Sequence, residues 1–173
     1  MAERKHQNKA QETEQIIAFA QRNDWIYNTV DEKDFVSSGA EQKVYIKSKR
    51  HVVKLNDAIY YASWEDYFHN LLLHNFFFSD TAYKLIGFHL TEESGCYAVV
   101  QQPFVEADDM TELNDVKDFL TANGFQNTRN HDYYHSELGI ILEDLHDENV
   151  LTKQGVLYFI DTVFYVKPEI FWK

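Results

Sequence analysis

Apolar and polar residues recur with two different periods along the chain, and each period predicts one kind of element. Three stretches place apolar residues three and four positions apart, as the buried face of an amphipathic helix requires. They are residues 11–22, 63–75 and 109–123. Shorter runs rich in Val, Ile, Tyr and Phe, bounded by turn-forming residues, are typical of strands. They are residues 35–36, 44–46, 51–55, 83–90, 96–102, 139–142, 150–151 and 157–160.

The second helix carries the clearest start signal. Ser63 lies three residues before Asp66, which resembles a capping box, so we expect Ser63 to cap the helix N-terminus. The buried side of this helix is expected to hold Trp64, Tyr67, Phe68, Leu71 and Leu72, and we also assign the run Phe76-Phe77-Phe78 to the core. We interpret these helices and strands together as a compact α+β domain.

Composition and charge exclude several classes of protein. With 173 residues and 16% aromatic residues, the chain can form an ordered domain with a sizeable core. A net charge of −12 argues against binding to nucleic acid or to an anionic membrane, because both need a basic face. The chain has one cysteine, a polar start and no apolar run of membrane-spanning length. We therefore expect a cytoplasmic protein.

The strongest chemical signal is a polar cluster between two apolar runs near the end of the chain. His146-Asp147-Glu148-Asn149 lies between 139–142 and 150–151, Asp144 precedes it, and Asp161 follows the run 157–160. Polar groups this close to a core are costly unless something binds them. Carboxylate and amide oxygens are the ligands that Mg²⁺ prefers, with substrate phosphates completing its shell. An ordinary hairpin with a solvated acidic turn would show the same residues.

The spacing adds a family resemblance. Asp144, four residues, Asn149 and then Asp161 after a short hairpin resemble the catalytic centre of the protein-kinase-like superfamily. The form Asp-Leu-His is closer to the aminoglycoside phosphotransferase type than to His-Arg-Asp protein kinases. The whole stretch is most similar to kinase-like domains of polyvalent proteins from phages and conjugative elements. This resemblance implies that Asp144 is the catalytic base and that Asn149 and Asp161 hold Mg²⁺ for ATP, with His146 supporting the loop.

The resemblance also implies nucleotide-binding residues in the first half of the chain. Lys54 would contact the phosphates, and Glu65 on the second helix would pair with it, although their spacing is shorter than in protein kinases. Gly39 would lie in the loop that covers the phosphates, and Gln102 and Phe104 would lie at the adenine hinge. Each has an ordinary alternative: a surface lysine on an edge strand, a first-turn acid that favours the helix dipole, and a plain hairpin glycine.

The resemblance gives a complete, testable layout. We expect an N-terminal helical segment (1–30), a kinase-like N-lobe with an antiparallel sheet and one main helix (31–105), and a reduced C-lobe with the catalytic hairpin (106–173). The implied function is a minimal kinase-like domain that binds MgATP and phosphorylates a hydroxyl acceptor, for which we favour a protein. Two alternatives remain: a non-catalytic pseudokinase-like module that binds nucleotide or protein, and a metal-dependent hydrolase that uses the same acids.

Overall fold

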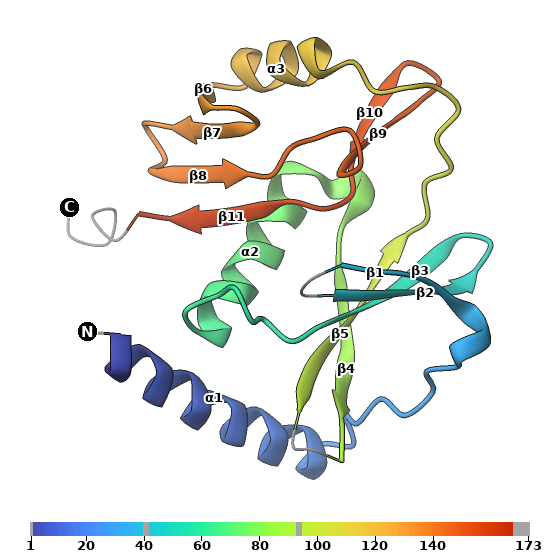
Figure 1. The fold of residues 1–173 in the computed structure, drawn as a ribbon, viewed down its shortest axis with the longest axis vertical. Helices are drawn as coiled ribbons and strands as arrows, with labels where there is room; N and C mark the ends of the chain where they lie inside the picture. The colour runs from blue at the N-terminus through green and yellow to red at the C-terminus, as the bar shows by residue number, and fades with distance from the viewer. Residues whose placement is uncertain (1, 40–41, 93–94, 168–173) are drawn as a thin grey trace. The chain divides into compact units, whose positions relative to one another are not determined.

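The structure is a computed structural model that describes residues 2–39, 42–92 and 95–167. The chain forms two compact units, each with its own sheet (Figure 1). Unit 1 comprises Met1–Phe68 and Ala82–Phe104, and unit 2 comprises His69–Thr81 and Val105–Lys173. Residues 69–81 belong to unit 2, and the chain from Val105 onward belongs to unit 2 as well. The division into a helical segment and two lobes stays a prediction.

Unit 1 is built on a five-stranded antiparallel sheet in the order β1-β2-β3-β5-β4. Its strands are β1 (Phe35–Ser38), β2 (Gln42–Ser48), β3 (His51–Asn56), β4 (Lys84–Leu90) and β5 (Cys96–Pro103). Every residue of β3 after His51 is buried. Because successive side chains point to opposite faces, both faces of β3 are covered. The predicted strands of the first half are thereby confirmed.

One face of this sheet is covered by the chain that leads into β1. Tyr27 and Val30 pack on a core of Tyr45, Val53, Leu55 and Val99. The segment also pairs with β4, because Tyr27 N–H donates to Phe88 O (2.7 Å) and Phe88 N–H to Trp25 O (2.8 Å). Gly87 permits this approach: its φ is +151°, and a Cβ there would lie 2.7 Å from Trp25 O.

Helix α1 (Ala2–Arg22) extends further towards the N-terminus than the predicted range 11–22, and it packs on unit 1. Glu12 Oε2 accepts the backbone N–H of Trp64 (2.7 Å), and Thr13 Oγ1 accepts the indole N–H of the same residue (2.9 Å). Lys9 Nζ donates to the carbonyl oxygens of Ala58 and Tyr61. Glu12 therefore satisfies an N–H at the start of the next helix, where such groups lack a helical partner.

Helix α2 (Trp64–Phe77) starts as the sequence predicts, since Asp66 N–H donates to Ser63 Oγ (3.0 Å). Trp64, Tyr67 and Leu71 are buried. Leu72 and Phe76 are 66% and 77% exposed, so their assignment to the buried side was wrong. They lie four residues apart on the same exposed stripe of the helix, and hydrophobicity alone did not distinguish that stripe from the buried one.

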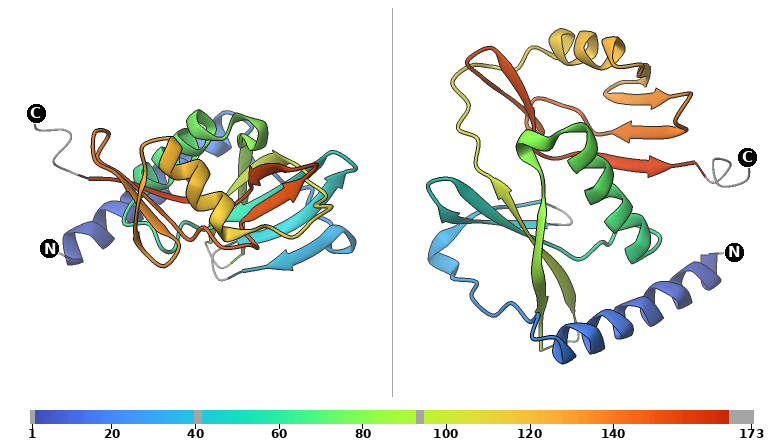
Figure 2. Two further views of the ribbon diagram at one scale, coloured as in Figure 1. Left: turned by 90° about the horizontal axis from the view of Figure 1, so that it is seen from above. Right: turned by 180° about the vertical axis from the view of Figure 1, so that it is seen from behind.

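Unit 2 has a four-stranded sheet in the order β11-β8-β7-β6, a separate hairpin and helix α3 (Leu113–Ala122), all visible in Figure 2. The sheet strands are β6 (Gln126–Arg129), β7 (Asp132–His135), β8 (Ile140–Glu143) and β11 (Val163–Val166), and the hairpin is β9 (Val150–Lys153) with β10 (Val156–Phe159). Strands β6, β7 and β11 were not predicted. None of the described helices is long and apolar enough to span a membrane.

The core of unit 2 lies between these elements and the C-terminal part of α2. Its fully buried members include Val116 and Leu120 from α3, Leu142 from β8 and Val150 from β9. Aromatic rings fill the remaining space: Phe78 stacks on Phe159 with centroids 4.0 Å apart. The mixed helix and antiparallel-strand class is therefore confirmed, while the lobe arrangement stays a prediction.

Candidate active site

The loop between β8 and β9 holds the polar cluster, and a buried leucine anchors it. Leu145 has no exposed surface, and its N–H donates to His131 O (3.2 Å). Its neighbours Asp144 and Asp147 are exposed. The loop is also closed internally, since Asn149 N–H and Val150 N–H both donate to His146 O at 3.0 and 3.1 Å. Burial of one apolar side chain thus holds a short charged loop at the surface of unit 2.

Asp144 has an unusual backbone conformation. Its φ is +67°, in the left-handed region that residues other than Gly, Asn and Asp rarely adopt. The side chain is 59% exposed, so water or a substrate can reach its oxygens. The backbone N–H of Asp144 donates to Asp132 Oδ1 (3.3 Å) on β7. Uncommon backbone conformations of this kind concentrate at functional sites, where neighbouring contacts maintain them.

Asn149 holds Asp144 from the far end of the loop. Its Nδ2 donates to Asp144 O (2.8 Å) and to Asp144 Oδ2 (3.0 Å). The same nitrogen also lies 3.1 Å from His146 Nε2. Among the described residues, no donor is bonded to Asn149 Oδ1. The oxygen that a magnesium ion would need is therefore not engaged within the described part of the chain.

His146 completes the support of Asp144. Its Nδ1 accepts the Glu148 N–H (3.3 Å), and its Nε2 lies 3.4 Å from Asp144 Oδ1. Nε2 also lies 3.1 Å from Asn149 Nδ2, a nitrogen that can only donate. His146 Nε2 therefore lies against both the Asn149 amide and the Asp144 carboxylate. Asn149 donates to one carboxylate oxygen of Asp144, and His146 lies beside the other.

Asp161 lies beside this loop in unit 2. It lies two residues after the end of β10, and its backbone N–H donates to Asn149 O (3.3 Å), as does that of Ile160 (2.9 Å). The structure thus places three of the predicted site residues, Asp144, Asn149 and Asp161, next to one another. Their oxygens are hard donors, which fit Mg²⁺. The described residues contain no group of three or more His, Cys, Asp or Glu side chains placed to hold a metal, so phosphate oxygens would have to complete the shell.

The surroundings of the loop are acidic. Burial raises the pKa of Glu143, the last residue of β8, and the nearby charges of Asp132 and Asp144 raise it further. The folded chain therefore disfavours the ionised form of the Glu143 side chain. A bound cation would relieve this repulsion, because an opposite charge within a few ångströms favours ionised carboxylates.

In unit 1, Lys54 is an interior residue of a central strand. It is 5% exposed, its backbone pairs with Val44 and Val100, and its ammonium lies 5.4 Å from the centre of the Tyr83 ring. The alternative of a surface lysine on an edge strand is therefore excluded. Gly39 N–H donates to Gln42 O (2.9 Å) at the β1–β2 turn. Ala40 and Glu41, which belong to the predicted phosphate-covering loop, lie outside the described residues.

The other predicted residues of unit 1 are less well placed. Glu65 is exposed in the first turn of α2, and within the described ranges its side chain makes no hydrogen bond or ion pair. Its pairing with Lys54 stays a prediction. Gln102 is 1% exposed and pairs with Val52 of β3. Phe104 N–H donates to Arg50 O (2.8 Å), so that N–H already has an acceptor.

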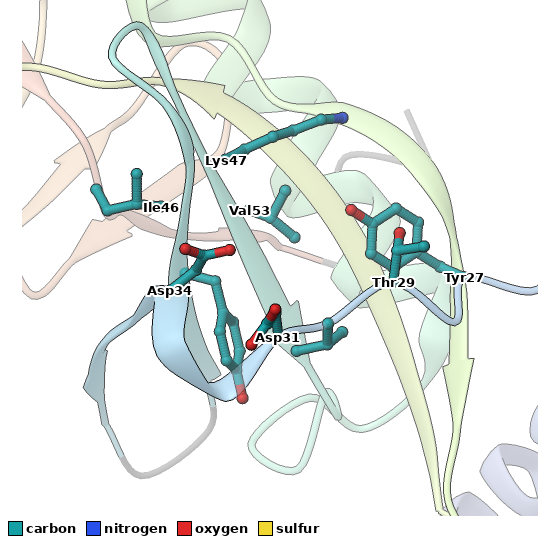
Figure 3. A pocket seen from close by; sticks show the side chains of 9 residues that line it. Tyr27, Thr29, Asp31, Asp34, Ile46, Lys47 and Val53 are labelled. Atoms are coloured by element: carbon teal, nitrogen blue, oxygen red, sulfur yellow. The ribbon is translucent and has the colours of Figure 1, made fainter.

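Unit 1 also contains a pocket of about 170 Å³ on the face covered by the segment before β1 (Figure 3). Its lining includes Asp31, Asp34, Tyr45, Lys47 and Val53. Val53 and Lys54 are neighbours on one strand and point to opposite faces. The pocket therefore opens on the face of the sheet away from Lys54, and it is not the predicted nucleotide site.

Several residues near Asp161 were missed by sequence reasoning. They are Asn70, His74, Thr81 and Thr162, which are all buried. The available signal was in α2, where Asn70 and His74 interrupt an otherwise apolar buried stripe. A polar residue on such a stripe must find hydrogen-bond partners inside the fold.

Comparison with known proteins gives one match. A family model described as "Serine/Threonine/Tyrosine Kinase found in polyvalent proteins" matches residues 9–168. No curated protein and no solved structure matches the chain. The match covers both units and includes every residue of the predicted site.

Proposed function

The chain belongs to the family of serine/threonine/tyrosine kinases found in polyvalent proteins, and on this premise we propose that it binds MgATP and transfers the terminal phosphate to a hydroxyl group. The observation that carries the proposal is the orientation of Asp144. Asn149 Nδ2 donates to one of its oxygens, His146 Nε2 lies 3.4 Å from the other, and the backbone N–H of Asp161 donates to Asn149 O. Phosphoryl transfer depends mainly on positioning and charge neutralisation, which a fixed loop of this kind can supply.

Each residue then has a defined task. Asp144 accepts the proton of the acceptor hydroxyl while the hydroxyl oxygen bonds to the γ-phosphorus, and the bond to the β-phosphate oxygen breaks to release ADP. Asn149 Oδ1 and the Asp161 carboxylate would hold the magnesium ion, which would supply neutralisation of the phosphate charge. Lys54 contacts the α- and β-phosphates, with Glu65 as its partner. Gly39 covers the phosphates, and Gln102 and Phe104 border the adenine.

The acceptor is proposed to be a protein hydroxyl, since the family name refers to serine, threonine and tyrosine. The proposal requires Lys54 of unit 1 to face Asp144 and Asp161 of unit 2 in the active form. This requirement makes the proposal refutable by experiments on residues in the two separate units.

The test measures nucleotide binding and phosphate transfer separately. We expect ATP to bind more tightly with magnesium, and ³²P to pass from γ-labelled ATP to a generic protein. Asp144→Asn should keep binding and lower transfer by about 10²–10⁴-fold, the usual contribution of a positioned base. Asp161→Ala should abolish the effect of magnesium on binding, and Lys54→Met should weaken binding. Asp147→Asn, an exposed acid in the same loop, serves as the matched control and should change neither quantity.

The outcomes distinguish the functional classes. Magnesium-dependent binding without transfer that depends on Asp144 would indicate a non-catalytic module. Phosphate release without an acceptor would indicate a hydrolase. Absence of nucleotide binding by the unmodified chain would refute the proposal.

A further inference from the structure

A buried polar network in unit 2 connects α2 to the chain around Asp161. His74 has no exposed surface, and Thr81 and Thr162 are 1% and 2% exposed. His74 Nδ1 lies 2.7 Å from Thr162 Oγ1, while its Nε2 lies 3.1 Å from Thr81 O and 3.2 Å from Thr81 Oγ1. Polar groups this deeply buried are retained only when they are bonded, and these contacts use both nitrogens of the ring.

The direction of each hydrogen bond follows from the chemistry of the groups. Thr81 Oγ1 donates its one proton to Phe159 O (2.5 Å), and Phe78 O is a more distant acceptor of the same proton (3.2 Å). The carbonyl and the hydroxyl oxygen of Thr81 must then both accept from His74 Nε2, so that nitrogen carries the ring proton. Nδ1 is left as an acceptor, and Thr162 Oγ1–H donates to it. His74 therefore acts in one defined tautomer, with a donor towards Thr81 and an acceptor towards Thr162.

The network contacts both sides of Asp161. Phe159, whose carbonyl is bonded to Thr81, lies two residues before Asp161, and Thr162 follows it directly. One turn earlier on α2, Asn70 Oδ1 accepts the N–H of Phe164 (2.8 Å). Asn70 and His74 are four residues apart and share one face of the helix. That face is bonded to the chain on the C-terminal side of Asp161.

We propose that His74 is a positioning residue, which through Thr162 and Thr81 fixes the backbone on both sides of Asp161 and so sets the direction of its carboxylate. The inference rests on the proposed function, since it assumes that Asp161 holds magnesium. Groups that orient a metal ligand commonly change metal affinity about 10–100-fold when they are removed. The expected phenotype is accordingly a loss of magnesium affinity with nucleotide affinity preserved.

Two substitutions remove the same hydrogen bond from its two ends. Thr162→Val keeps the shape and deletes the donor, whereas His74→Gln can retain a donor towards Thr81 but carries its one acceptor, the amide oxygen, one bond beyond the position of Nδ1. The assay is calorimetric binding of a non-hydrolysable ATP analogue to the full chain over a range of Mg²⁺ concentrations. Each variant should raise the Mg²⁺ concentration for half-maximal enhancement about tenfold. The double variant should show no further rise, because both changes remove one interaction.

Controls separate positioning from folding. Thr162→Ser keeps the hydroxyl and should restore the magnesium response. Val116→Ala, in the same core on α3, should lower the melting temperature without changing that response. All variants should bind the analogue equally in the absence of magnesium.

The possible results separate the role of His74 from the proposed function. Unchanged magnesium dependence in folded Thr162→Val and His74→Gln would overturn the inference while leaving the proposed function intact. Failure of both variants to fold would also overturn it, because the network would then be needed for the fold itself. If the unmodified chain shows no magnesium-dependent binding, the proposed function fails first.

Discussion

Replacing Leu145 by alanine tests how the fold holds the acidic loop. The side chain is completely buried in the core of unit 2, whereas the residues around it are exposed or partly exposed. Leu→Ala at buried sites costs about 2–5 kcal/mol, made up of lost transfer free energy and the cavity that remains. The backbone bond from Leu145 N–H to His131 O does not involve the side chain, so the loss comes from packing alone. We expect a loss of about 3 kcal/mol in the free energy of unfolding.

Urea unfolding followed by far-ultraviolet circular dichroism measures this loss. The matched control is Leu72→Ala on α2, where the leucine is 66% exposed, and it should change stability by less than about 0.5 kcal/mol. Because Asp144 precedes Leu145, the variant should also reduce phosphate transfer under conditions in which it remains folded. Equal unfolding curves for the two alanine variants would show that Leu145 does not anchor the loop in solution.

Three further predictions concern other parts of the chain. Because the pKa of Glu143 is raised, the folded state binds the carboxyl proton more tightly than the unfolded state does. The free energy of unfolding therefore falls as pH rises through and above the ordinary carboxyl range. Glu143→Gln should remove this loss, so its melting temperature should exceed that of the unmodified chain at about pH 7 but not at about pH 4. Burial raises the pKa of Cys96 to about 11, so a disulfide reagent should react slowly with the native chain and rapidly after denaturant is added. Rapid reaction of the native chain with the reagent would show that the Cys96 thiol is not buried. Gly124→Ala should lower the free energy of unfolding in urea more than Gly155→Ala. Both glycines have positive φ, but only at Gly124 would an added Cβ lie 2.6 Å from the His135 ring. Equal losses for the two variants would argue against that contact.

The sequence predicted elements best where a local period coincided with burial. The β9–β10 hairpin was predicted from apolar runs on either side of Lys153-Gln154-Gly155, and it forms with Gln154 and Gly155 at positive φ. Strand β6 was missed because Gln126–Arg129 is polar and fully exposed, so no alternation marks it. Strand β11 was not predicted, because its pairing with β8 joins segments distant in sequence.

In the candidate site, too, residues in a local motif were predicted and long-range contacts were not. Spacing and the family resemblance selected Asp144, Asn149 and Asp161 as candidates, and unit 2 places them next to one another. The partners of the buried His74 were not predictable, because hydrogen bonds between residues 74 and 162 depend on tertiary packing. The pairing of Glu65 with Lys54 was inferred from the position of Glu65 in the helix. That position tells which helical turn holds the residue but not whether its side chain is exposed. Placement of Lys54 opposite the acids remains a prediction.

The left-handed backbone of Asp144 has a consequence for how this position can change over evolutionary time. At φ +67°, the substitutions that keep the loop conformation at little cost are asparagine and glycine, and both abolish proton acceptance. A lineage that abandoned phosphorylation could therefore keep a well-folded loop with one such replacement. Reversion would be equally accessible from asparagine, since Asn and Asp codons differ at a single base. Stereochemistry at one residue would thus make the catalytic state easy to lose and easy to regain.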